Sequence, residues 1–131
     1  MDSLQNLYYA IGEMAYAMAS VDGKVQKEER DKFFQIVASE LKNNEHNFDI
    51  SEIVFRLMDK EHQDSETVYN WGMKQIKLNS HYLSPELKEK FIRVMEKVAE
   101  AYPPVTSEES NLLDRFKEEM EEIHGDPVFF E

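Results

Sequence analysis

The spacing of apolar residues constrains this fold more than any other feature of the sequence. Apolar side chains recur three and four positions apart along most of the chain, as they do on the buried face of a helix. The first such stripe lies in residues 3–20 and consists of Leu4, Leu7, Tyr8, Ile11, Met14, Ala15 and Met18. Only four glycines and four prolines interrupt the chain, and runs of β-branched residues are absent. We therefore predict an all-α fold.

Breaks in the pattern divide the chain into six or seven helices. A second helix should follow the Asp22-Gly23 turn and carry Leu41 on its apolar stripe, until KNNEHN at 42–47 ends it. The third is expected to use Asp49 or Ser51 as its N-cap. Its expected apolar face is Ile53, Val54, Leu57 and Met58.

The second half of the chain is likewise divided into predicted helices by breaks in the apolar pattern. A fourth helix, over residues 65–77, is apolar around much of its circumference, so we expect it to be the most enclosed element. Pro85 suits the first position of a fifth helix, which the prolines of AYPPV end. In the sixth, Thr106 and Glu109 have the spacing of a capping box.

Length, charge and composition limit the classes of function. At 131 residues the chain suits one domain, predicted over residues 1–124, with a tail at 125–131 that either docks or exposes Val128, Phe129 and Phe130. A net charge of −12 disfavours nucleic acid as a partner. We expect no membrane insertion, since no apolar run approaches the roughly 20 residues that span a bilayer. The absence of cysteine fits the reducing cytoplasm, where we expect the protein to be.

Two corners between helices share one plan at an offset of 80 residues. In each, an apolar helix ends in alanine, a break and a valine follow, and the next helix has a glutamate near its start. Val25 and Glu29 correspond to Val105 and Glu109, but Tyr102 and Pro103 stand where Asp22 and Gly23 would be expected. The repeat suggests two related helix-turn-helix halves around the third and fourth helices.

The first corner, DGKVQKEE, matches the second half of a calcium-binding EF-hand loop. Met18 and Ser20 occupy the first and third loop positions, so a calcium ion would lack ligands there. The simpler interpretation is structural. Gly23 adopts a positive φ, Val25 docks on the core, and Glu29 folds back onto the amides that open the next helix.

The combination AMASVDGKVQKEERDKF, with its echo KVAEAYPPVTSEESNLLDRF, resembles the tellurite-resistance protein TerB family, whose members read A-x-A-D-G-x-[IV]-x-x-x-E. The resemblance implies an all-helical cytoplasmic domain, without enzymatic activity, that is linked to stress or tellurite resistance and works with membrane-associated partners. It also implies a divalent metal ion, for which calcium, magnesium and manganese are the candidates. The implied ligands are Asp22 and Glu29, with Glu13 a looser candidate, and the second corner could add only Glu108 or Glu109.

Three function classes remain open from the sequence. The first is a non-enzymatic binding or sensing protein that uses a metal. The second is a metal-independent adaptor that engages a protein partner through its acidic surface or its PVFFE tail. The third, ranked last, is a small enzyme with paired carboxylates, which need only be close in the fold. Other chemistry is disfavoured, because the histidines lack zinc-site spacing and no phosphate loop or serine elbow occurs.

Overall fold

The computed structural model describes residues 1–37, 39 and 48–130. Within them it is all-helical, as predicted. The elements are α1 (Ser3–Ser20), α2 (Lys27–Ile36), α3 (Phe48–Lys60), α4 (Ser65–Leu78), α5 (Pro85–Glu100) and α6 (Ser107–Glu121), with short 3₁₀ turns η2 (Ser80–Tyr82) and η3 (Pro127–Phe129). The predicted place of Leu41 on the second helix lies outside the described residues.

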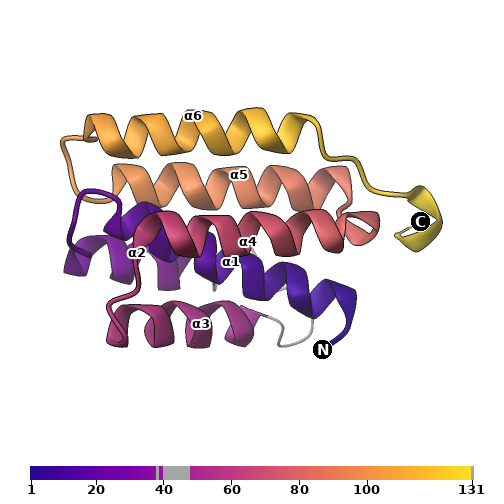
Figure 1. Ribbon diagram of the computed structural model, residues 1–131, viewed down its shortest axis with the longest axis horizontal. Helices are drawn as coiled ribbons and strands as arrows, with labels where there is room; N and C mark the ends of the chain where they lie inside the picture. The colour runs from indigo at the N-terminus through magenta and orange to yellow at the C-terminus, as the bar shows by residue number, and fades with distance from the viewer. Residues whose placement is uncertain (38, 40–47, 131) are drawn as a thin grey trace.

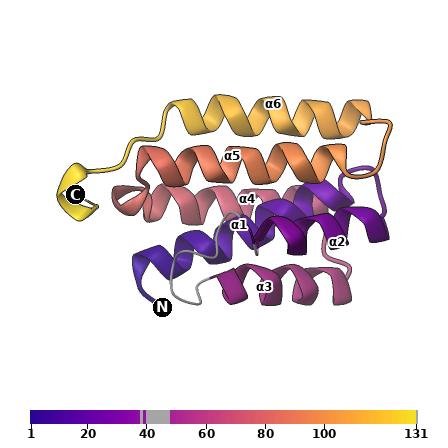
Figure 2. The same ribbon diagram turned by 180° about the vertical axis from the view of Figure 1, so that it is seen from behind.

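Helix α1 is the centre of the bundle. It packs most extensively against α4 and α3, and it also contacts α5, α6 and α2 (Figure 1). The view from behind shows α3 at one edge of the molecule and α6 at the other, with α1, α4 and α5 between them (Figure 2). All ten residues from Ala10 to Ala19 are buried, so α1 is more enclosed than α4, where Trp71 remains 43% exposed. The prediction for α4 was therefore wrong.

A close contact between α1 and α3 explains much of this enclosure. A Cβ added at Gly12 would lie 2.5 Å from the carbonyl oxygen of Ser51 and 3.0 Å from its Cα. The Ser51 hydroxyl is buried and donates a hydrogen bond to the Tyr8 carbonyl at 2.6 Å. Small residues on the facing surfaces thus allow the two helix backbones to approach closely.

The structure corrects two predictions about α3. The helix begins at Phe48, before both predicted caps, and Ser51 is used against α1 instead. Only part of the predicted apolar face is buried: Val54 and Met58 lie in the core, whereas Ile53 is 64% exposed and Leu57 also faces outward. The buried face of α3 differs from the predicted one because close packing at Gly12 and Ser51 fixes the rotation of α3 about its axis.

The tail docks on η2. The Asp126 N–H donates to the His81 carbonyl at 3.1 Å, and the Phe129 ring packs against the rings of His81 and Tyr82. Val128 remains 82% exposed, so the docking covers only part of the predicted apolar set. None of the helices in the described residues is long and apolar enough to cross a bilayer.

Candidate functional site

The two predicted corners lie at the same end of the bundle. Helices α1 and α5 both finish there, and α2 and α6 both start there, as the two opposite views show (Figures 1 and 2). The offset of 80 residues in the sequence therefore corresponds to two similar turns placed side by side. Helix α2 packs against α5, which brings the start of α2 toward the second corner.

The first corner has the predicted helix geometry. Gly23 has a φ of 105°, a left-handed conformation that glycine adopts without steric cost. The Gln26 N–H donates to Glu29 Oε1 at 2.8 Å, which completes a capping box at the start of α2. Val25 packs against the core, and Asp22 is exposed. The structural prediction for Gly23, Val25 and Glu29 is confirmed.

The second corner repeats the capping box but not the docking valine. Glu109 Oε1 accepts from the Thr106 N–H at 3.0 Å, and the Thr106 hydroxyl accepts from the Glu109 N–H at 3.1 Å. Val105, which aligns with Val25 in the sequence, is 45% exposed and does not dock as Val25 does. The corners are alike in how each helix begins and differ in what holds the preceding loop.

The glutamates of the two boxes meet in the interior. Both Glu29 and Glu109 are 1% exposed. Burial raises the pKa of Glu29 to about 8, although the Gln26 N–H opposes this shift. A side-chain hydrogen bond to Glu109 and the charges of Glu109 and Asp22 raise this pKa further. Two ionised carboxylates cannot hydrogen-bond to each other, so the contact requires a proton on the pair.

One oxygen of this pair has no donor. Apart from the proton shared with Glu29, no donor among the described residues reaches the buried Glu109 Oε2. A buried acceptor in this state is costly unless a proton, water or ion satisfies it. The buried carboxylates of Glu29 and Glu109 therefore need one positive charge, which a proton or a cation could supply.

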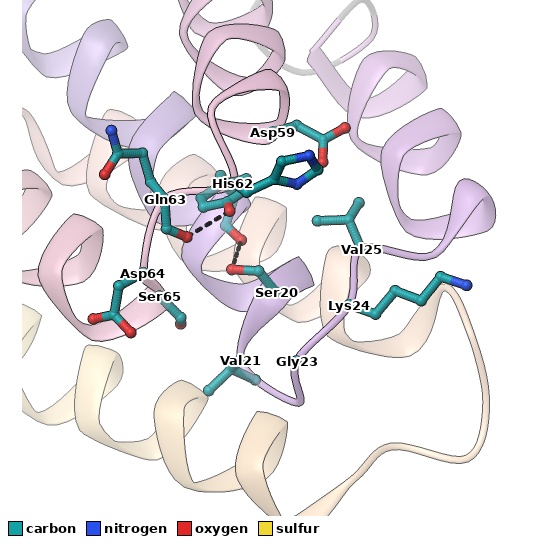
Figure 3. Close-up of a pocket in the computed structure, with 11 residues that line it drawn as sticks. Ser20, Val21, Gly23, Lys24, Val25, Asp59, His62, Gln63, Asp64 and Ser65 are labelled. Atoms are coloured by element: carbon teal, nitrogen blue, oxygen red, sulfur yellow. Dashed lines mark hydrogen bonds between the residues drawn. The ribbon is translucent and has the colours of Figure 1, made fainter.

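A pocket lies beside the first corner, between Ser20–Val25 and the loop that joins α3 to α4 (Figure 3). Ser20 Oγ donates to the Tyr16 carbonyl at 2.8 Å, and the Tyr16 hydroxyl donates to the Gln63 carbonyl at 2.6 Å. Dashed lines at Ser20 and Gln63 in Figure 3 mark these two bonds. The acids that line it already have partners: Asp59 pairs with Arg30, and Asp64 caps α4. Asp22 does not line this pocket.

Glu13 lies apart from the corner. It is on the second half of α1, seven residues before the helix ends at Ser20, or about 10 Å along the helix axis. Burial raises its pKa to about 7, and neither Glu29 nor Asp22 contributes to that shift. It lines a groove with Tyr9 and Trp71 instead. The three residues that the resemblance implied as ligands therefore do not converge.

A family model described as "Tellurite resistance protein TerB" matches residues 9–125. The chain belongs to the TerB family. No curated protein and no solved structure matches the chain.

The donor set of this TerB-family chain fits a metal ion only in part. Glu29 and Glu109 each use one oxygen in a capping box, and Asp22 is close enough to Glu29 to affect its pKa. No group of three or more acidic, histidine or cysteine side chains in the described residues is placed to hold a metal. The buried pair could supply two oxygen ligands, and a third would require Asp22 to turn inward.

Two features of the TerB-family chain were missed or left open by the sequence. The choice between Glu108 and Glu109 was open, and the structure selects Glu109, because the third position of the capping box points inward. Trp71 lies on the helix that was expected to be the most enclosed, yet it is 43% exposed. Its neighbours at helical spacing, Lys74 and Gln75, are polar, and this pattern could have placed it on the surface.

Proposed function

We propose that this TerB-family chain is a non-enzymatic binding protein of a bacterial stress or tellurite-resistance system, and that its paired corners take up a divalent cation. The observation that carries the proposal is the buried contact between Glu29 and Glu109, with Glu109 Oε2 lacking a donor. The pair needs positive charge to be stable in the interior. In the absence of a metal ion, a proton shared by the two carboxylates would supply this positive charge. A bound metal ion would replace that proton.

Glu29 and Glu109 would provide the first two oxygen ligands, and Asp22 the third. Three carboxylates fall short of the six to eight oxygens that calcium prefers, whereas magnesium and manganese keep several waters. We therefore expect weak binding that favours the smaller ions. When bound, the ion would supply charge and order the first corner, and the protein would carry out no reaction.

A calorimetric titration of the wild type and Asp22→Asn with calcium, magnesium and manganese tests this proposal. We expect heat from the wild type and at least about fivefold weaker binding by Asp22→Asn, because one charged ligand is lost. Asp114→Asn, an exposed change on α6, serves as the matched control and should bind like the wild type. Proton release on binding should make the measured enthalpy depend on the buffer.

The titration tests metal binding and the role of Asp22 as a ligand separately. No heat from the wild type with any of the three ions would reject the metal. Equal heats from the wild type and Asp22→Asn would remove Asp22 from the ligand set while the glutamate pair remained.

The second candidate is a metal-independent adaptor. The feature that favours it is the tail, where Val128 is 82% exposed and Phe129 is 44% exposed beside η2. An apolar tip on a chain of net charge −12 suits a protein partner, which could belong to a membrane-associated stress complex. A wild type that binds no metal but retains a partner would favour this candidate.

A further inference from the structure

Glu13 is buried without a partner. Glu13 is only 3% exposed, and its Oε1 atom accepts no hydrogen bond from the described residues. Likewise, the ion pairs in the described part of the chain do not include it. An acid in an apolar helix face without a counter-ion is destabilising, so its presence calls for a ligand or a proton.

Glu13 is one of the residues that line an open groove of about 530 Å³ between α1 and α4. Tyr9 and Trp71 contribute aromatic rings to the groove, and Lys74 and Gln75 contribute polar groups. Trp71 is 43% exposed, which is high for the only tryptophan of the chain. The groove thus combines a buried acid with accessible aromatic surface.

Donors lie in the same groove as the buried acid. Asn79 Nδ2 donates to the Gln75 side-chain oxygen at 3.2 Å and to the Gln75 carbonyl at 2.8 Å. This fixes the Gln75 oxygen toward Asn79, so its amide nitrogen stays available to an acceptor. Lys74, on the same turn of α4, is exposed and forms no ion pair with the part of the chain that the structure describes.

We propose that this groove binds a small zwitterionic amino acid. The ammonium group would pair with Glu13, the hydrocarbon part would lie on Tyr9 and Trp71, and the carboxylate would face Lys74 and Gln75. Ammonium groups bind well where a carboxylate is combined with aromatic faces. A simple alkylamine would satisfy Glu13 but meet the charge of Lys74, and a simple carboxylate would meet Glu13. A metal ion would find a single carboxylate here, which is too few ligands.

The single tryptophan gives a direct measurement, because Trp71 lines the groove. Titration of the full chain with leucine, 4-aminobutanoate, butylamine and butanoate should be followed by intrinsic fluorescence. We expect at least one of the two zwitterions to change the signal at the lowest concentration, butylamine to bind more weakly, and butanoate to have no effect. Magnesium and calcium are included to detect a metal response at the same site.

Three variants test which charged side chains contact the ligand. Glu13→Gln keeps the size of the side chain and should weaken zwitterion binding at least about tenfold. Glu89→Gln, an exposed change on α5 that alters net charge equally, should bind like the wild type. Lys74→Ala should remove the preference for zwitterion over butylamine. Circular dichroism of each variant checks that the helices are intact.

Several results would overturn the proposal. These are the absence of a fluorescence change with both zwitterions, equal binding by the wild type and Glu13→Gln, binding of butylamine or butanoate as tight as that of the zwitterions, or a response to metal ions alone. Because the groove lies apart from Asp22 and Glu29, each of these results is independent of metal binding at the corners.

Discussion

At the scale of single residues, Glu29 combines two environments in one side chain. One carboxylate oxygen caps α2 through the Gln26 N–H, and the same carboxyl group reaches Glu109 in the interior. Glu29 in the folded protein, with its pKa of about 8, therefore keeps its proton well above the ordinary glutamate pKa of 4.5, at which an unfolded chain releases it. Since the folded state binds more protons between these values, the free energy of unfolding should fall as pH rises through this window.

Glu29→Gln should remove much of this dependence on pH. The glutamine oxygen can still accept from the Gln26 N–H, and its amide can donate to Glu109 Oε2, which lacks a donor. We expect the variant to exceed the wild type in stability at pH 8.5 by roughly 1 to 2 kcal/mol. Urea unfolding at pH 5, 7 and 8.5 measures this difference. Both proteins should retain a smaller slope below pH 7, because burial also raises the pKa of Glu13.

Glu28→Gln provides the control for this experiment, since Glu28 is the exposed neighbour on the same helix. It should follow the wild type at all three pH values. A Glu29→Gln variant that is less stable than the wild type at pH 8.5 would show that the pair is not short of a donor.

At the scale of helices, the contact of α1 with α3 depends on a missing side chain. Gly12 faces the Ser51 backbone, and Val54 Cβ would lie only 3.1 Å from a Cβ at this position. Alanine is a better helix former than glycine by about 1 kcal/mol, so local preference favours the substitution. The backbone of a buried residue cannot move aside as a flexible side chain can, and the packing effect should therefore dominate.

Gly12→Ala should lower the free energy of unfolding by about 1 to 3 kcal/mol, the usual cost of overpacking a core. Denaturant unfolding gives the magnitude, and hydrogen exchange should show lost protection in α1 and α3. Gly23→Ala is the comparison: nothing lies within 4 Å of its Cβ, so it should lose only about 1 kcal/mol, from the positive φ. Equal stabilities of Gly12→Ala and the wild type would mean that the two helices are not closely packed in solution.

At the scale of the whole molecule, His81 connects the two ends of the chain. Its Nε2 lies 3.2 Å from the Ser3 hydroxyl at the start of α1. Its ring centroid lies 5.0 Å from that of Phe129 in the tail, and its carbonyl accepts from the Asp126 N–H. One residue of η2 therefore holds both termini against the bundle.

His81→Ala should loosen both termini together. The backbone hydrogen bond to Asp126 would remain, but the ring contact and the Ser3 bond would be lost, for roughly 1 kcal/mol in stability. Hydrogen exchange should rise in the first turn of α1 and in residues 126–130, with little change in α3 or α5. His124→Ala, which changes an exposed histidine next to the tail, should leave exchange in α1 unchanged. Faster exchange at one terminus only would contradict the shared connection.

The sequence by itself determined what depends on neighbours a few positions away. Apolar spacing gave the helices, and the separation of three residues from Thr106 to Glu109 predicted a capping box, because such hydrogen bonds form within one helical turn. The positive φ of Gly23 and the role of Glu29 at the start of α2 followed in the same way. The repeat and the family resemblance were also properties of the sequence alone.

Only the tertiary structure decided which residues from distant segments meet. Glu29 and Glu109 form a pair because the packing of α2 on α5 places two capping boxes together, and no local pattern encodes that distance. Glu13 lies in a groove away from the corner, and the contact of α1 with α3 turns Ile53 outward. Helical periodicity defines an apolar face only to within the width of a stripe, whereas the exact rotation of each helix depends on contacts such as that of Gly12 with Ser51.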